Sequence, residues 1–411
     1  MYSDSNVSTK YLDPQIYTPN ARTTFQLDAS ESAYLPNMRL LNLGANSPTG
    51  GNQYNGLTGA LGLIKNIRLM DGKTVLCSAN EAQFHTAFKN VNETNERNQS
   101  VMSQQQCTTL GQTVNGADNK IARMAKILGT NTTVETTESG SIELKTILPM
   151  LSAVSHLPTA IFSNLNLQIE YYVGPQIIDD TSILVDTIRP ILAVDVIDNP
   201  VIVDNLNARL KSASWLEVEH DLFVIPAVSD TAAADNGVVQ PVNVQLNGFN
   251  NKRLERLLIT KEAGAAAVQN GAQVKGFGIF GSQSCFRQKL QFRVNGRNLL
   301  PRQGIVGNNE RLAHIVDHWG DCTAYIGSNQ YGTDPSPVLT DGLNFLGMVD
   351  FMGTYIGEYI NNLQIRYERT ALQDTGPRRS TSQAFTAHVY GEVRKQLQVG
   401  GVTGYRISYQ Q

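Results

Sequence analysis

Residues 165–171 have the sequence LNLQIEY, and this stretch decides the organisation of the chain because it occurs almost unchanged a second time. Residues 361–367 have the sequence NNLQIRY, 196 positions further along the chain. In both copies Leu, Ile and Tyr alternate with other residues, which is the pattern of a β-strand with one buried face. The repeat predicts two equivalent strands, one in each half of the chain.

A second repeated pattern precedes each copy of this strand. Residues 70–76 (MDGKTVL) and 294–300 (VNGRNLL) place Asp-Gly and Asn-Gly between apolar residues. Such dipeptides supply the positive φ angles of a two-residue hairpin turn. A helix-like patch follows each hairpin, at residues 81–88 and 310–319. The same order of elements thus occurs twice, which predicts two β domains of one type in tandem; the alternative is chance similarity between ordinary strands.

The composition favours a loop-rich all-β protein with two domains. The 411 residues are enough for two domains with substantial cores. The 34 glycines, together with many Asn, Gln, Thr and Ser residues, favour strands and turns over helices. Only 17% of the residues are charged and the formal net charge is −3, which suggests that other copies of the chain cover much of the surface.

The chain shows no pattern typical of a secreted or membrane-spanning protein. The first ten residues are polar and no apolar run follows them. No segment approaches the ~20 apolar residues that span a bilayer. The four cysteines lack the spacing of zinc ligands or of a disulfide framework, so we expect free thiols in a reducing compartment. They are Cys77, Cys107, Cys285 and Cys322.

Turn signals and apolar runs divide the chain into five parts. These are an amino-terminal arm (residues 1–22), a first β domain (23–199), a linker (200–212), a second β domain (213–400) and a carboxyl-terminal tail (401–411). The arm has no apolar periodicity, so we expect an extended segment that is either disordered or ordered by a partner. Asp-Asn-Pro interrupts a β-branched apolar run just before the linker and marks the boundary between the domains.

Three finer expectations concern single elements. Asp204 or Asn205 is expected to cap one helical turn in the linker. Apolar residues at helical spacing predict a short amphipathic helix over residues 117–128. Residues 215–225 alternate between two mixed faces, which favours a strand at a surface between domains or between subunits.

The order and duplication of these patterns resemble a known family, the double jelly-roll major capsid proteins of double-stranded DNA viruses. The similar branch includes virophages, polinton-like viruses and nucleocytoplasmic large DNA viruses. Five stretches carry the resemblance: the two hairpin and helix units at residues 67–88 and 290–319, the loop and paired strand at 148–172, the junction at 188–221 and the closing strand at 389–405.

The resemblance implies an all-β fold of two tandem eight-stranded jelly rolls, with short helices and long loops. It implies a homotrimer with a nearly hexagonal outline, in which six similar barrels surround a three-fold axis and tile an icosahedral virion shell. The implied partners are the chain itself, neighbouring trimers, penton and minor capsid proteins, and an inner membrane touched by the termini. The protein would be made in the host cell without a secretory signal and would not bind nucleic acid specifically.

Tyrosines near both termini are the candidates for contacts between subunits. An amphipathic tyrosine that lies on a neighbouring subunit gains contact area at a small entropic cost. The alternative for both termini is plain disorder. The candidate assembly contacts are Tyr2, Tyr11, Tyr17, Tyr405 and Tyr409.

The sequence predicts no enzyme, and no catalytic, cofactor-binding or metal-binding residues. Residues 276–281 (GFGIFG) match the glycine string of dinucleotide-binding folds, but a Gly/Ala-rich loop precedes them and a strand is expected after them. His314 and His318 are four apart, yet the residues between them lack the Glu of a zinc protease site. No His-x-His pair occurs. The other histidines are scattered, at His85, His156, His220 and His388.

Two alternatives to a major shell protein stay open on the sequence. The first is a minor capsid or spike protein whose jelly roll binds host carbohydrate. The second is an enzyme of the bicupin type, which also has two jelly rolls but holds a metal ion inside the barrel, a site for which the scattered histidines offer little support.

Overall fold

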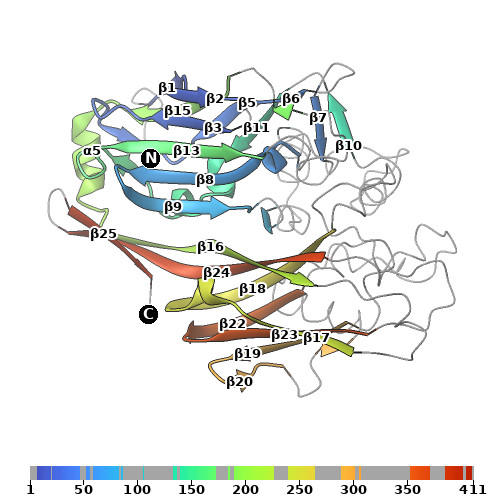
Figure 1. Ribbon diagram of the computed structural model, residues 1–411. Helices are drawn as coiled ribbons and strands as arrows, with labels where there is room; N and C mark the ends of the chain where they lie inside the picture. The colour runs from blue at the N-terminus through green and yellow to red at the C-terminus, as the bar shows by residue number, and fades with distance from the viewer. Residues whose placement is uncertain are drawn as a thin grey trace, which may run out of the picture.

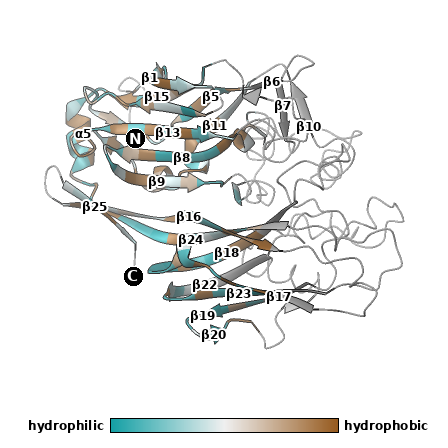
Figure 2. Ribbon diagram, viewed as in Figure 1, coloured by the Kyte–Doolittle hydropathy of each residue, from teal (hydrophilic) through white to brown (hydrophobic). Residues whose placement is uncertain are grey.

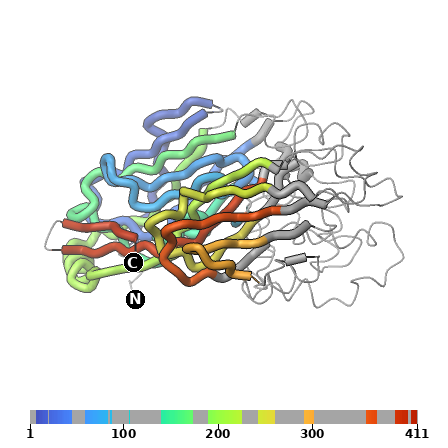
Figure 3. Tube along the Cα trace, turned by 60° about the horizontal axis from the view of Figure 1, so that its bottom comes forward, coloured from blue at the N-terminus to red at the C-terminus, as the bar shows by residue number. Residues whose placement is uncertain are grey.

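The computed structural model consists of two β-barrels that stand side by side (Figure 1). Their strands run in about the same direction, as the turned view also shows (Figure 3). The structure describes residues 7–19, 21–46, 52–55, 59–82, 85–86, 105, 133–136, 139–172, 184–185, 189–225, 239–263, 288–300, 305–306, 352–370, 385–400 and 404–409.

The first barrel is a jelly roll of two four-stranded sheets. In spatial order, one sheet contains β1 (Val7–Leu12), β15 (Ile191–Ile197), β5 (Arg39–Leu43) and β11 (Gly140–Glu143). The other contains β3 (Arg22–Gln26), β13 (Leu165–Tyr171), β8 (Ile64–Asp71) and β9 (Thr74–Asn80). Short strands extend these sheets: β2 (Ile16–Thr18), β4 (Ala33–Tyr34) and β12 (Leu157–Pro158).

The second barrel repeats this arrangement strand for strand. In spatial order, one sheet contains β16 (Ser212–Ile225), β24 (Phe385–Gly400), β18 (Lys252–Ala263) and β22 (Met352–Ile360). The other contains β17 (Val239–Gln245), β23 (Leu363–Thr370), β19 (Gln288–Val294) and β20 (Arg297–Asn298). Two further strands are attached, β21 (Ile305–Val306) to β19 and β25 (Gly404–Tyr409) to β24. Numbered along the chain, the principal strands of each barrel have the order first-eighth-third-sixth and second-seventh-fourth-fifth, which is that of a jelly roll.

The remaining elements are short. A small sheet contains β6 (Ala45–Asn46), β7 (Asn52–Asn55), β10 (Thr133–Thr136) and β14 (Leu184–Val185). The described helical segments are η2 (Gly59–Leu63), η5 (Leu144–Thr146), α4 (Met150–Ala153), α5 (Pro200–Asn207) and η7 (Asn247–Phe249). Among the described residues, no helix is long and apolar enough to cross a membrane.

The repeated strand holds the same position in both barrels, so the prediction from the LQI repeat is confirmed. β13 lies between β3 and β8, and β23 lies between β17 and β19. Ile169 pairs with Ile67 of β8, and Ile365 pairs with Phe292 of β19. All four of these side chains are buried, whereas Glu170 and Arg366, the next residues of the two repeated strands, are exposed. Figure 2 shows hydrophobic and hydrophilic segments in turn along β13 and β8. The period of two therefore specifies which face of each strand enters a core.

The two hairpins differ in detail from the expected Asp-Gly and Asn-Gly turns. Asn295 and Gly296 form the second turn, with φ angles of 48° and 84°. In the first hairpin Asp71 still pairs with Thr74, so the turn moves on by one residue and Gly72 takes the positive φ of 58°. Asp71 and Asn295 nevertheless make equivalent hydrogen bonds just before the repeated strand. The Asp71 side chain accepts from the backbone N–H of Asn164, and the Asn295 side chain accepts from that of Asn361.

Each barrel has its own apolar core, and β16 contributes to both. Trp215 packs in the first core and Phe223, eight positions further along the same face of the strand, packs in the second. The right-handed twist of a long strand allows this change of direction. Leu397 of β24 also lies in the first core. The expected strand over residues 215–225 at a surface between domains is therefore confirmed.

The ends of the chain and the linker differ from the sequence expectation. β1 and β2 lie within residues 1–22, the expected arm, and pair with β15 and β3 of the same chain. β25 lies within the expected tail and pairs with β24. The structure shows that a cap at Asp204 or Asn205 is wrong, because the helix begins one turn earlier and the Asn199 side chain accepts from the backbone N–H of Val201. The predicted helices at 117–128 and 310–319 lie outside the described residues.

Candidate functional site

Buried titratable side chains gather where the two barrels meet. Strand β9, at the edge of one sheet of the first barrel, lies beside β16, at the edge of a sheet of the second (Figure 1). Two groups of buried polar residues lie along this seam. The histidine cluster consists of Glu81, His85, His220, His388, Tyr390 and Glu392, and the Glu217 cluster consists of Ser78, Trp215, Glu217 and Lys395.

Strand pairing builds the second-barrel side of the histidine cluster. In the antiparallel register of β16 and β24, His220 pairs with Tyr390 and Leu222 pairs with His388. His220 and His388 are therefore diagonal neighbours on one face. His220 Nε2 and His388 Nδ1 lie 2.9 Å apart in a hydrogen bond. One of the two nitrogens must carry the proton and the other must accept it.

Glu81 enters the cluster from the first barrel. It directly follows β9 and has a φ of 47°, a left-handed conformation that is uncommon for a residue other than glycine. Its backbone carbonyl accepts a 2.8 Å hydrogen bond from the Tyr390 hydroxyl. Its carboxylate Oε2 lies 3.5 Å from His388 Nδ1 and 4.0 Å from His220 Nε2. The cluster thus joins groups from both barrels.

Glu392 extends the histidine cluster along β24. Its side chain is almost fully buried, and a buried carboxylate needs a partner to stay charged. Arg256 of β18 supplies that partner, with Nη2 2.6 Å from Glu392 Oε2. His85 Nε2 of the first barrel lies 3.3 Å from the other carboxylate oxygen of Glu392. The carboxylate therefore bridges a strand of its own barrel and a residue of the other.

Burial controls the protonation of His220. Desolvation, together with the neighbouring His388, lowers the pKa of His220 to about 3. The imidazole of His220 is therefore neutral at neutral pH, and its ring keeps a nitrogen lone pair.

The Glu217 cluster is a buried ion pair that accepts further hydrogen bonds from Trp215 and Ser78. Lys395 Nζ lies 2.6 Å from Glu217 Oε1, and the side chains are 9% and 1% exposed. The Trp215 indole N–H donates to Glu217 Oε2 at 3.0 Å, and the Ser78 hydroxyl of β9 donates to Oε1 at 3.1 Å. Burial lowers the pKa of Lys395, but the charge and hydrogen bond of Glu217 outweigh that effect and leave it raised. Lys395 thus keeps its charge, and the hydrogen bond from Ser78 attaches β16 to the first barrel.

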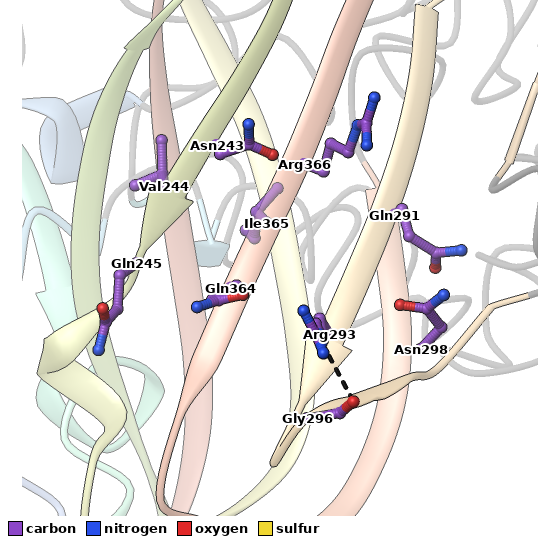
Figure 4. Close-up of a pocket in the computed structure, with 10 residues that line it drawn as sticks. All are labelled: Asn243, Val244, Gln245, Gln291, Arg293, Gly296, Asn298, Gln364, Ile365 and Arg366. Atoms are coloured by element: carbon purple, nitrogen blue, oxygen red, sulfur yellow. Dashed lines mark hydrogen bonds between the residues drawn. The ribbon is translucent and has the colours of Figure 1, made fainter.

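A polar hollow lies on the outer face of the second barrel. It has a volume of about 690 Å³ and is open to solvent. Amide and guanidinium side chains on neighbouring strands line it, including Gln245, Gln364, Arg293 and Asn298 (Figure 4). A polar outer face is expected for a sheet whose other face covers an apolar core.

Several solved structures resemble the chain over nearly its whole length. No protein-family model and no curated protein sequence matches the chain. A capsid model of PBCV-1 virus matches with a TM-score of 0.56, 12% identity and coverage of 100% of this chain and 99% of that one. PBCV-1 VP54, fitted into a reconstruction of the virophage Sputnik, matches with a TM-score of 0.55, 11% identity and coverage of 99% and 97%. The mavirus major capsid protein matches with a TM-score of 0.54, 10% identity and coverage of 99% and 90%.

The chain has the double jelly-roll fold of viral major capsid proteins. The resemblance drawn from the repeated strand is therefore confirmed for the fold. Both barrels take part, since the matches cover nearly the whole of the chain.

The predicted tyrosines occupy different positions on the double jelly roll. Tyr11 of β1 is 65% exposed and Tyr17 of β2 is half-buried. The Tyr405 hydroxyl donates to Asp71 at 2.9 Å, and the Tyr409 hydroxyl donates to Glu219 at 2.8 Å. These two hydrogen bonds attach the carboxyl-terminal strand to its own chain. Tyr2, like the glycine string at 276–281 and the pair His314 and His318, lies outside the described residues.

Sequence reasoning missed the two clusters of the seam. His220 and His388 are 168 positions apart, so no local spacing connects them. A weaker signal was present in β24, where His388, Tyr390 and Glu392 alternate with other residues and so share one face of a strand. In the double jelly roll that face meets the other barrel.

Proposed function

We propose that this protein is a major capsid protein that self-assembles into homotrimers with a nearly hexagonal outline, which tile the icosahedral shell of a virion. The fold supports this proposal, since capsid proteins are among the solved structures that resemble it over almost the whole chain. The role is structural rather than catalytic. We also propose that the first domain ends at residue 199 and that the second domain spans residues 213–400.

The observation that carries the proposal is the way in which the barrels meet. Within one chain, edge strand β9 of the first barrel contacts edge strand β16 of the second. The strands at the equivalent positions are β20 in the second barrel and β1 in the first. In the described part of the chain, β20 pairs with β19 alone and β1 pairs with β15 alone. Figure 1 shows β1 and β20 on opposite outer sides of the molecule.

The same contact can be repeated between chains. If β20 of one copy meets β1 of the next as β9 meets β16, each copy continues the ring in one direction. Such a head-to-tail contact closes when the rotation divides a full turn evenly. Three chains then place six similar barrels around one axis, and each barrel meets two neighbours through equivalent edges.

Side chains at the β1 edge fit a role in this contact. Tyr11 is 65% exposed and Ile16 of the adjacent β2 is 42% exposed. Apolar and aromatic groups of this kind are enriched at the buried centre of protein interfaces. We assign Tyr11 and Tyr17 to the contact between subunits within the trimer. Tyr2, Tyr405 and Tyr409 belong to the same proposal as contacts between subunits. The wider partners proposed for the trimer are neighbouring trimers, penton and minor capsid proteins and an inner membrane.

Native mass spectrometry of the purified chain, combined with electron microscopy, tests the proposal. We expect three copies per particle and a six-lobed outline. Tyr11→Asp should shift the mass towards the monomer, because a charge enters the contact. Val201→Asp is the matched control, since Val201 of α5 is 67% exposed but lies on neither edge. A wild-type protein that stays monomeric at every concentration would overturn the proposal.

A further inference from the structure

Three metal-binding groups converge in the histidine cluster. Glu81 Oε2, His220 Nε2 and His388 Nδ1 all lie within 4.8 Å of one another. The separations are 2.9 Å between the two nitrogens, and 3.5 Å and 4.0 Å from the carboxylate oxygen to His388 and His220. The three residues therefore place one potential ligand atom each within a small volume.

The donor set and its dimensions fit a zinc ion. Zinc binds imidazole nitrogen and carboxylate oxygen at about 2.0–2.2 Å in a tetrahedron, which places neighbouring ligand atoms about 3.3 Å apart. The three measured separations bracket this value. Two imidazoles with one carboxylate exclude magnesium and calcium as the preferred ions, because those ions favour oxygen ligands alone.

Strand pairing and hydrogen bonds fix the backbone of all three residues before any ion binds. Pairing between β16 and β24 fixes the backbone of His220 and His388. Glu81 is held by a hydrogen bond from its N–H to the carbonyl of Lys65 and by the bond from Tyr390 to its own carbonyl. The side chains of His220 and His388 are 9% and 4% exposed, whereas that of Glu81 is 22% exposed. Solvent therefore approaches the cluster from the Glu81 side.

We propose that Glu81, His220 and His388 bind one zinc ion that joins the two jelly rolls, with a water molecule as the fourth ligand. Zinc takes the place of the proton between His220 Nε2 and His388 Nδ1, and the imidazole that carried it adopts the tautomer with its proton on the other ring nitrogen. The ion would link the first barrel, through Glu81, to β16 and β24 of the second. Its role is structural, since it fixes the relative position of the barrels. The proposal is independent of the proposed function, because it concerns the contact within a single chain.

Zinc binding to the purified full-length protein tests this inference. After dialysis against a chelator, titration with zinc chloride should give one ion per chain by calorimetry and by elemental analysis. The ion should raise the melting temperature, because it binds the folded seam and not the unfolded chain. Magnesium and calcium chloride should have no such effect. Cobalt(II) chloride should give the visible absorption of a tetrahedral site.

Variants separate this site from other sources of bound zinc. Glu81→Gln and His388→Gln should each weaken zinc binding by at least about tenfold and abolish the rise in melting temperature. The matched control is the double variant His314→Gln, His318→Gln, which removes the only other histidine pair with chelating spacing in the sequence. That control should keep both the stoichiometry and the thermal shift. Because the readout is the zinc-dependent shift, a moderate loss of basal stability in one variant does not obscure it.

Two results would overturn the inference. One is a wild-type protein that takes up no zinc after removal of the chelator, which would make the cluster a hydrogen-bonded network only. The other is loss of zinc in the His314 and His318 double variant but not in Glu81→Gln, which would place the ion elsewhere. If His388→Gln fails to fold, Glu81→Gln still decides the question, since it keeps the size and shape of the side chain.

Discussion

The hydroxyl of Tyr390 donates a 2.8 Å hydrogen bond to the backbone carbonyl of Glu81, across 309 positions of the chain. Tyr390 is fully buried, and the bond connects β24 of the second barrel to the end of β9 in the first. It is therefore a direct tie between the barrels.

Tyr390→Phe should destabilise the protein by about 1 kcal/mol, the usual net contribution of one buried hydrogen bond. Urea unfolding followed by tryptophan fluorescence measures the change, because Trp215 lies at the seam. Val201→Ala, at an exposed position of α5 outside both edges, should leave the unfolding midpoint nearly unchanged. Equal midpoints for Tyr390→Phe and the wild type would show that this bond does not stabilise the seam.

Lys395→Met should cost about 3–5 kcal/mol, because it leaves the carboxylate of Glu217 buried without its cation. The side chain of Glu217 is only 1% exposed, so water cannot replace the lost partner. The double variant Lys395→Met, Glu217→Gln should recover part of the loss, since the uncompensated charge is gone. Urea unfolding of the wild type, Lys395→Met, Glu217→Gln and the double variant gives the coupling energy between the two side chains. Strictly additive losses would contradict an ion pair that acts as a unit.

Gly391→Ala should destabilise the second barrel by about 1–3 kcal/mol through overpacking. A Cβ atom at this position would lie 2.3 Å from Phe249 Cε1 and 2.7 Å from Leu254 Cδ1. Gly400→Ala on the same strand is the control, since a Cβ atom there would meet nothing within 4 Å. Thermal unfolding measures both variants. Phe249→Leu should partly rescue Gly391→Ala, and a failure to do so would locate the strain elsewhere.

His156 should make the protein less stable in mild acid. Burial lowers the pKa of His156, although the hydrogen bond to Asn207 acts in the opposite direction. Below its ordinary value of 6.5 the unfolded chain takes up a proton that the folded chain refuses, so stability is full above that pH and falls below it. The slope from one such group is at most about 1.4 kcal/mol per pH unit.

The measurement for His156 compares urea unfolding at pH 7.5 and pH 5.5, values chosen on either side of the ordinary histidine pKa of about 6.5. His156→Gln keeps a polar group near Asn207 but does not titrate in this range. The variant should therefore lose less stability than the wild type between the two conditions. The other histidines are the same in both proteins, so their effects cancel. An equal loss in both would assign the acid sensitivity to other groups.

The architecture could be predicted from the sequence because the repeat consists of short patterns of neighbouring residues. The alternation in residues 165–171 and 361–367 specifies a buried face for β13 and β23 without any knowledge of their partners. β1 was missed for the opposite reason. Its residues VSTKYL are half-buried or exposed, and only pairing with β15, some 185 positions away, makes them a strand. The hairpin shift at Gly72 likewise depends on a bulge in the pairing of β8 with β9.

The candidate site was less predictable than the fold. Its residues come from β16, β24 and the end of β9, and they meet only once both barrels have formed. Scattered histidines gave no sign of this, because histidine spacing reports a site only when the ligands share one element. Residues 215–225 were the exception, since their two mixed faces did predict a strand at a surface between domains.

The placement of Leu210, Trp215 and Leu397 in the core of the first jelly roll bears on how the polypeptide matures. A ribosome adds Leu397 about 200 residues after the last principal strand of that barrel. The core of the first barrel therefore stays incomplete, with part of its apolar surface exposed, while the second barrel is being synthesised. Nascent chains would expose that apolar surface to chaperones until β24 has been made, and the two barrels would then reach the native state in one cooperative step.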